Sequence, residues 1–225
     1  MALTEIIGPV MVGPSSSHTA GAVKLGNIAR RLWGDKIGQV DIFLRGSFAA
    51  TYWGHGTDRA LLGGLMGWYP DDRRIKDAYN RAKKSGLNYH FYQEAIDGAH
   101  PNSVRFMIKS SHKKMELVGA STGGGSVCIQ EIDHFPVNIN GELAALIFLH
   151  QDRPGIVSSI TTELFRMNLN IAEMSLRRKA RGQEAMMVIE MDSMPDRNTL
   201  ENLKNIDHIF NKMYFIPSIA GGCQQ

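Results

Sequence analysis

The sequence predicts an α+β protein built from two domains. The first half mixes helical apolar periodicity with short alternating strands, and the second half places its elements in the order β-α-β-β-α-β. A short connector with proline and asparagine, residues 135–141, separates the two patterns. The order in the second half is that of the ferredoxin-like split βαβ fold. We therefore expect domains at residues 1–138 and 143–218, followed by a flexible tail at 219–225.

Helical spacing and strand alternation predict the elements of the first domain. Residues 22–33 carry apolar side chains at helical spacing, as at Val23, Ile28 and Leu32. Residues 70–84 begin with Pro-Asp-Asp and are strongly charged, which predicts a helix with a solvated face. The other elements expected here are one or two helical turns at 48–53, a helix from residue 60, and strands at 40–44, 88–93, 104–108, 115–118 and 127–132.

The second domain opens with a continuous apolar strand over residues 143–150. A turn follows in which Pro154 lies near the first position of a helix, the place where proline is favoured. That helix spans residues 156–167. Its apolar positions predict a buried side made of Ile156, Ile160, Leu164 and Phe165. The remaining expected elements are strands at 171–178, 185–191 and 213–216 and a helix at 195–206.

Bulk composition is that of a globular protein with a sizeable core. Of its 225 residues, 43% are hydrophobic and 21% are charged. The net charge of +3 is spread along the chain without a basic block, which argues against a nucleic-acid surface. Cys128 and Cys223 give no disulfide framework, and neither a membrane-spanning run nor a signal-peptide pattern is visible. We expect a cytoplasmic protein.

Hydroxyl side chains cluster before the first helix, where a Gly-Pro turn leads into three serines, a histidine and a threonine. A helix start carries unpaired N–H groups and the positive end of the dipole, which suit a carboxylate or phosphate. Capping needs one hydroxyl, whereas this stretch offers four, from Ser15, Ser16, Ser17 and Thr19, beside the imidazole of His18. We interpret it as a pocket for a small anion or an amino acid, and the alternative is a helix start that is merely polar.

A second junction of this design follows at residues 54–59. Glycines on both sides of His55 leave the imidazole uncrowded and let the backbone approach a ligand. Thr57 or Asp58 is expected to cap the next helix. His55 is interpreted either as a site residue or as an ordinary helix end, and the sequence favours neither.

Two further loops have a polar or glycine-rich composition. One is the turn His100-Pro101-Asn102. The other contains Gly123, Gly124 and Gly125 between two strands, more glycine than a simple hairpin requires. Exposed amides that bind an anion or a partner are one interpretation, and a bulged hairpin is the other.

The second domain resembles an ACT domain, a small regulatory module that often senses amino acids. Residues 149–157, Leu-His-Gln-Asp-Arg-Pro-Gly-Ile-Val, and residues 168–171, Asn-Leu-Asn-Ile, carry the resemblance. It implies either self-association alone or a regulatory ligand as well. The residues that it implies for such a ligand are Asp152, Pro154, Gly155, Val157, Asn168 and Asn170.

The first domain resembles the β subunit of bacterial iron–sulfur-dependent L-serine dehydratase, which deaminates L-serine to pyruvate and ammonia. Four motifs carry the match in order, at residues 13–19, 54–58, 100–102 and 121–125. This domain is also similar to the allosteric substrate-binding domain of phosphoglycerate dehydrogenases, which implies a mixed α/β fold and shows that such a fold need not be catalytic.

The resemblance implies a [4Fe–4S] cluster whose open iron site polarises the serine hydroxyl. Thiolates hold such clusters. This chain offers only Cys128, in an expected strand, and Cys223, in the expected tail. The resemblance therefore implies that a separate α subunit ligates the cluster and that this chain supplies no metal ligand. The role of Cys223 stays open.

The resemblance also implies roles for residues of the four motifs. His18 or His55 is the candidate general base, because imidazole titrates near neutral pH. The expected substrate-binding residues are Ser15, Ser16, Ser17, Thr19, Thr57, Asp58, Asn102, Gly123, Gly124 and Gly125. The alternative is a non-catalytic subunit in which the same loops sense serine and the ACT domain relays the signal. Threonine as substrate, the oligomeric state and a monovalent cation stay open.

Overall fold

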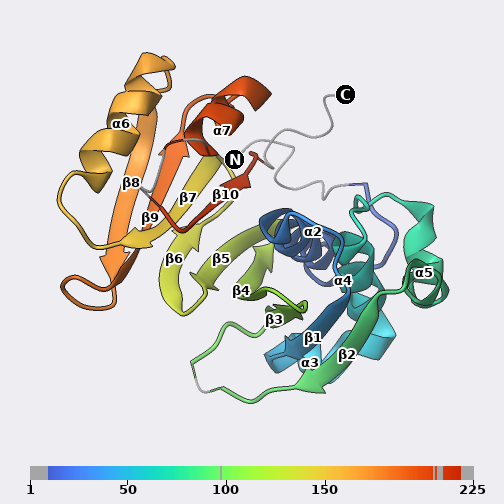
Figure 1. The fold of residues 1–225 in the computed structure, drawn as a ribbon. Coiled ribbons are helices and arrows are strands. Elements are labelled where there is room, and N and C mark those ends of the chain that lie inside the picture. Colours follow the sequence, from blue (N-terminus) through green and yellow to red (C-terminus); the bar gives the residue numbers. More distant parts are fainter. Residues whose placement is uncertain (1–9, 97, 205, 207–209, 219–225) are drawn as a thin grey trace. The chain divides into compact units, whose positions relative to one another are not determined.

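The computed structural model describes residues 10–96, 98–204, 206 and 210–218, and the chain divides after Asn140 into two compact units (Figure 1). The predicted tail at 219–225, with Cys223, lies outside the described residues. Among the helices that the structure describes, each is too short or too polar to span a bilayer.

A six-stranded sheet forms the centre of the first unit. Its strand order is β2-β1-β3-β4-β5-β6, in which β1 and β2 run parallel and the other neighbours antiparallel. A parallel pair needs a long crossover, and the helices between β1 and β2 provide it. The strands are β1 (Gln39–Leu44), β2 (Asn88–Gln93), β3 (Ser103–Lys109), β4 (Lys114–Gly123), β5 (Ser126–Ile132) and β6 (Phe135–Ile139).

Two helices of the first unit cross in backbone contact. A Cβ added to Gly64 in α4 would lie 2.1 Å from the carbonyl oxygen of Val23 in α2, and one added to Gly26 would lie 2.5 Å from that of Leu61. Glycine at both positions therefore permits the close crossing. The helices of this unit are η1 (Ser16–Gly21), α2 (Ala22–Trp33), α3 (Gly46–His55), α4 (Thr57–Leu65), η2 (Arg73–Asp77) and α5 (Ala78–Ser85).

The second unit has the predicted β-α-β-β-α-β order and is a four-stranded antiparallel sheet in the order β10-β7-β9-β8. Its core packs Phe148, Ile189 and Met187 of the sheet against Ile160 of α6 and Leu203 of α7. The α+β prediction is thus confirmed. The elements are β7 (Ala144–Gln151), α6 (Ile156–Arg166), β8 (Ile171–Arg178), β9 (Glu184–Met191), α7 (Arg197–Lys204) and β10 (Lys212–Ile216).

Two predicted helices were wrong in extent. The short segment at 48–53 is the ten-residue helix α3, which continues through Gly54 and ends at Gly56 in the left-handed region with φ of 71°. The helix expected at 70–84 is a 3-10 turn, η2, followed by α5. Asp72 caps η2 by accepting a hydrogen bond from the Arg74 amide at 2.9 Å, so helical structure begins after Asp72 rather than at Pro70.

Two further predictions were wrong for reasons of packing. The connector at 135–141 contains strand β6, which pairs with β5 and tolerates Pro136 because it is the edge of the sheet. Phe165 is 82% exposed although it was expected on the buried side of its helix. Leu164 fills the core position, and successive residues of a helix are rotated by about 100°, so Phe165 points away from the core.

The glycine-rich run closes a bulged hairpin, which was one of the two interpretations of this loop. Gly123 pairs with Ser126, which leaves Gly124 and Gly125 as a two-residue turn with φ of 59° and 82°. Turns that require positive φ at both central residues favour glycine. The ladder also shifts register between Ser121 and Gly123, which accounts for the third glycine.

Candidate functional site

His18 lies at the centre of the predicted motifs. Its Nδ1 is 3.3 Å from the Oγ of Ser15, and its Nε2 is 3.1 Å from the Oγ of Ser47 at the start of α3. The ring meets Phe48 edge-on, with centroids 5.3 Å apart, and the ring of His55 lies 5.0 Å away. Both imidazole nitrogens are thus held by hydroxyls, and the two candidate bases are neighbours.

The environment of His18 favours its neutral form. Burial is the main cause that lowers the pKa of His18 from its ordinary value of 6.5, and the nearby His55 lowers it further. A hydrogen bond with Ser47 acts in the opposite direction without reversing the shift. His18 is therefore uncharged at neutral pH and able to accept a proton.

The serine-rich stretch forms a π-helical turn, η1, rather than a loop ahead of an α-helix. Ser15 caps it, because its Oγ accepts a hydrogen bond from the His18 amide at 3.2 Å. Turns of this kind occur frequently at functional sites. Two glycines permit its packing: a Cβ on Gly13 would lie 2.2 Å from the Oγ1 of Thr19, and a Cβ on Gly21 would lie 2.1 Å from the Oγ of Ser121.

Backbone contacts connect the third motif to the others. The carbonyl of Pro101 accepts from the amide of Phe48 at 3.2 Å, and the carbonyl of Asn102 accepts from the amide of Ser121 at 2.9 Å. A Cβ on Gly46 would lie 2.6 Å from the Cα of Pro101, so the loop packs directly on the start of α3. The four sequence motifs therefore meet in one region of the first unit.

Three predicted binding residues carry buried oxygens that lack a protein partner. Among the described residues, these are the Oγ1 atoms of Thr19 and Thr57 and the Oδ1 of Asn102. A buried polar group without a hydrogen bond costs about 1–3 kcal/mol and calls for water or a ligand. None of the three residues lines the cavities described for this unit, so a hydrogen bond to any of these atoms would come from a buried water or from a ligand that displaces neighbouring groups.

A cavity of about 210 Å³ lies beside His55. Its lining includes Gly13 and Pro14 of the first motif and the cations of Arg59 and Lys76, but not His18. Guanidinium and ammonium groups beside an imidazole suit a small carboxylate. The cavity thus has the charge expected for an amino-acid substrate, and its volume is sufficient for a small one.

The predicted cap at the start of α4 was wrong. The helix begins after Gly56 without a side-chain cap. Asp58 is 1% exposed and accepts hydrogen bonds from the amide of Arg59 at 2.8 Å and from the hydroxyl of Tyr79. Burial and this bond to Asp58 raise the pKa of Tyr79, which therefore stays protonated and donates to the carboxylate. These contacts tie Asp58 to the protein itself.

Sequence reasoning missed Ser47 and Ser121. No role was predicted for Ser47, although it lies in the first turn of α3 and contacts His18 across 29 positions. Ser121 was quoted as part of a motif without a role, yet it packs against Gly21 and is fully buried. A Gly-Ser pair before a helical apolar run is the signal that would have found Ser47.

The six residues predicted for an ACT ligand lie at opposite ends of α6 within one chain. Pro154 and Gly155 precede the helix and Asn168 and Asn170 follow it, and 11 residues of helix span about 16 Å. Gly155 before the helix and Asn168 after it have positive φ values of 91° and 55°, so the helical conformation stops at both residues. Val157 lies in the first turn and packs against the core of the unit.

Asp152 and Asn170 are engaged by neighbouring residues. Asp152 accepts hydrogen bonds from the amide of Gly182 and from Arg178, both at 3.0 Å, and the Gly182 bond is the main cause that lowers its pKa. Asn170 donates to Asp192 at 2.5 Å. A ligand at either end of the helix would have to compete with these contacts.

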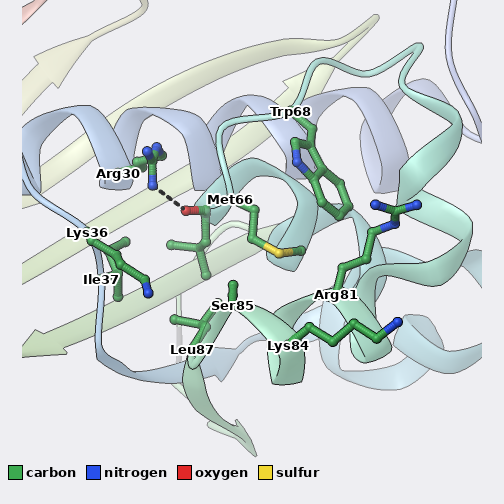
Figure 2. A pocket seen from close by; sticks show the side chains of 10 residues that line it. Arg30, Lys36, Ile37, Met66, Trp68, Arg81, Lys84, Ser85 and Leu87 are labelled. Carbon is green, nitrogen blue, oxygen red and sulfur yellow. Dashed lines mark hydrogen bonds between the residues drawn. The ribbon is translucent and has the colours of Figure 1, made fainter.

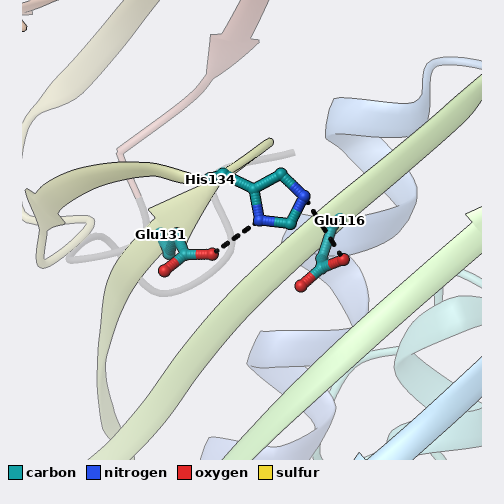
Figure 3. A group of neighbouring side chains, drawn as sticks. All are labelled: Glu116, Glu131 and His134. Carbon is teal, nitrogen blue, oxygen red and sulfur yellow. Dashed lines mark ion pairs between the residues drawn. The ribbon is translucent and has the colours of Figure 1, made fainter. Parts of the chain in front are cut away.

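One group of described side chains has the composition of a metal site (Figure 3). Glu116, Glu131 and His134 place one ligand atom each within 4.8 Å of one another. Each also has a protein partner: His134 lies 3.5 Å from Glu131 and 3.9 Å from Glu116, and Glu116 lies 3.6 Å from Arg105. The sequence prediction of no metal ligand in this chain did not consider this group, whose side chains already contact one another and Arg105.

Replacing His55 with Asn is expected to raise the pKa of His18, because the charge of His55 lowers it. The pKa should nevertheless stay below 6.5, since burial is the larger cause. NMR titration of the imidazole resonances measures this shift, with His112→Asn as the control because His112 is exposed and distant in sequence from the site. An unchanged pKa in the His55 variant would contradict the close approach of the two rings.

Comparison with known proteins supports the resemblance of both domains. The family described as serine dehydratase beta chain matches residues 6–88, and the ACT domain family matches residues 144–208. A protein of Bacillus subtilis named probable L-serine dehydratase, beta chain, is 39% identical over 205 residues, which cover 91% of this chain and 93% of that protein.

Two other relatives are similar to this chain, and one of them has the same name. The L-serine dehydratase beta chain of Peptoniphilus asaccharolyticus is 38% identical over 190 residues, covering 84% of this chain and 86% of that protein. A D-3-phosphoglycerate dehydrogenase of Synechocystis is 27% identical over 177 residues, covering 78% of this chain but 32% of that enzyme. The chain therefore belongs to the L-serine dehydratase β-chain family and carries an ACT domain in its second half.

Proposed function

We propose that this chain acts with a separate α chain to convert L-serine to pyruvate and ammonia, and that its first unit contributes one wall of the active site. The observation that carries the proposal is His18, a half-buried imidazole held between the hydroxyls of Ser15 and Ser47 and lowered in pKa. The names of the two relatives at 38–39% identity support both the substrate and the need for an α chain.

Each part of the site has a role in this proposal. The hydroxyls of Ser16, Ser17 and Thr19 and the amides of η1 hold the substrate carboxylate, with Arg59 and Lys76 adding positive charge beside the cavity. Thr57 and Asn102 offer further buried oxygens that can accept from the substrate ammonium. The backbone of Gly123, Gly124 and Gly125 closes the pocket where the α chain docks.

His18 is the general base in this proposal. A neutral imidazole can take the α-proton of serine, and a pKa below 6.5 keeps it neutral at working pH. Ser15 and Ser47 fix the plane of the ring, since hydroxyls can donate to or accept from either nitrogen. His55 borders the cavity and orients the substrate while lowering the pKa of His18.

The described residues of this chain do not fit a [4Fe–4S] cluster. Cys128 is the one cysteine among them, its Sγ lies 3.2 Å from the Oδ1 of Asn138, and burial raises the pKa of its thiol. Cluster ligation requires several thiolates. We therefore assign the cluster to the α chain and limit this chain to binding and orienting the substrate and moving its proton.

Pyruvate formation from L-serine by the co-purified α and β chains tests the proposal. Ser47→Ala should lower kcat about tenfold with little change in KM, because Ser47 orients His18 without contacting the substrate. Ser111→Ala, at an exposed position, is the matched control. Iron and sulfide should be found only when the α chain is present. A stoichiometric cluster on this chain alone would refute the division of labour.

A non-catalytic serine sensor is the second candidate, and the ACT domain favours it. In that case L-serine should bind the chain without the α chain, and Ser47→Ala should leave pyruvate formation unchanged. Calorimetric titration of L-serine into the purified chain, combined with the activity measurement, separates the two functions. We propose self-association through the ACT domain in either case.

A further inference from the structure

A second cavity in the first unit lies on different residues from the His18 site and has a different character. It encloses about 540 Å³ between the ends of α2, α4 and α5 (Figure 2). Pockets for drug-sized ligands and cofactors span about 300–1,000 Å³. This cavity is therefore large enough for an organic ligand bigger than an amino acid, and none of its lining residues belongs to the four serine dehydratase motifs.

The charges around this cavity are all positive. Arg30, Lys36, Arg81 and Lys84 line it, and no carboxylate is among the lining residues. Within the described part of the chain, Lys36 and Lys84 form no ion pair, whereas Arg81 lies 3.5 Å from Asp77. Uncompensated cations around a concavity attract and concentrate anions.

The positive groups come from both sides of the cavity. Arg30 extends from α2 and is oriented by its Nη1, which donates to the carbonyl of Leu65 at 3.5 Å. Arg81 and Lys84 lie three residues apart on α5, so they share one face of that helix. Figure 2 shows Lys36 on the opposite side from these two side chains. A ligand that meets both groups carries more than one negative charge.

The walls between these cations are apolar. Ile37, Leu65, Met66, Trp68 and Leu87 line the cavity, and apart from Met66 they are buried. An inorganic anion makes no use of such walls, while an aromatic or apolar body can pack against them and cover the part of Met66 that is exposed. Charge and walls together indicate an anion with a flat or apolar body.

We propose that this cavity binds a phosphorylated small molecule with an aromatic body, of the nucleoside diphosphate class. The phosphates would contact Arg81 and Lys84, the aromatic body would lie against Met66, and Lys36 would contact the anion from the opposite side. Arginine binds phosphate through two parallel hydrogen bonds and lysine binds it as a point charge. Helix α5, which belongs to the segment expected from the sequence to be only a solvated face, would then form one wall of a ligand site. The proposal is independent of the proposed lyase function.

Titration calorimetry with ADP and the 225-residue chain tests this site. Binding should be saturable, should weaken with added salt, and should be tighter than that of pyrophosphate or adenosine alone. Lys36→Gln and Lys84→Gln should each weaken it about tenfold, since each removes a charge-assisted contact. Both lysines are exposed and unpaired among the described residues, so the variants should fold, which circular dichroism checks.

Two further variants locate the ligand. Lys83→Gln is the matched control, because Lys83 is exposed on the same helix but does not line the cavity, and it should leave the affinity within about twofold. Arg59→Gln changes the other cavity and should have as little effect. The proposal fails if ADP does not bind, if pyrophosphate binds as tightly as ADP, or if Lys83→Gln or Arg59→Gln weakens binding as much as Lys84→Gln does.

Discussion

His18→Asn is expected to lower serine turnover by the co-purified α and β chains about 10²- to 10⁴-fold, the range that a positioned general base contributes. The amide of asparagine can replace one hydrogen bond to Ser15 or Ser47 but does not take up a proton near neutral pH. The loss should appear in kcat, measured as pyruvate formed at saturating L-serine. A variant that keeps half of the original turnover would exclude His18 as the base.

The pH dependence of the original protein provides the second half of this test. Since the pKa of His18 is lowered, activity should be present above pH 6.5 and be lost as the pH falls through the folded-state value. The free energy of unfolding should also decrease as the pH is lowered below 6.5. The unfolded chain takes up a proton on His18 near pH 6.5, whereas the folded chain does so only at a lower pH. His112→Asn should change neither profile.

Gly64→Ala is expected to destabilise the protein by about 3 kcal/mol, at the upper end of what overpacking commonly costs. The added Cβ would lie 2.1 Å from the Val23 carbonyl oxygen and 2.9 Å from the Cα of Gly26, both backbone atoms that cannot rotate away. Helices α2 and α4 would have to separate. Thermal unfolding should move down by about 10 °C, as measured by circular dichroism.

Gly38→Ala is the matched control for this change. Nothing lies within 4 Å of a Cβ at Gly38 and its φ is not positive, so the substitution should alter stability by less than about 0.5 kcal/mol. The separation of α2 and α4 should also displace η1, which α2 continues, and reduce lyase activity at temperatures where the variant is still folded. Equal melting temperatures for the two variants would contradict the close helix crossing.

The sequence was most informative where periodicity alone determines an element. The strands of the second unit and helix α2 follow from apolar spacing, and the structure agrees with them closely. The wrong predictions concern segments whose structure depends on tertiary contacts. Strand β6 contains Pro136, which local rules count against a strand, and only its edge position makes it acceptable. The exposure of Phe165 depends on which of two adjacent apolar residues meets the core.

The site shows the same division between local and long-range information. His18 and Ser15 were found because hydroxyls and an imidazole stand together at a helix start, a pattern within five residues. Ser47 was missed because it reaches His18 only through the fold. The proximity of His55 to His18 was likewise absent from the sequence, since 36 intervening positions give no distance. Motifs thus identified the participants but not their contacts.

Because η1 is a π-helical turn, the number of residues between Ser15 and α2 determines where the side chain of His18 points. A π turn accommodates one residue more than an α turn, so deleting one residue from 16–21 would let an uninterrupted α-helix form. Every residue before the deletion would then rotate by about 100° around the helix axis relative to α2. In a related sequence that keeps the serines and the histidine but lacks one residue of this segment, the imidazole would therefore point away from Ser47. The length of the segment, as well as its composition, thus identifies chains that retain this site.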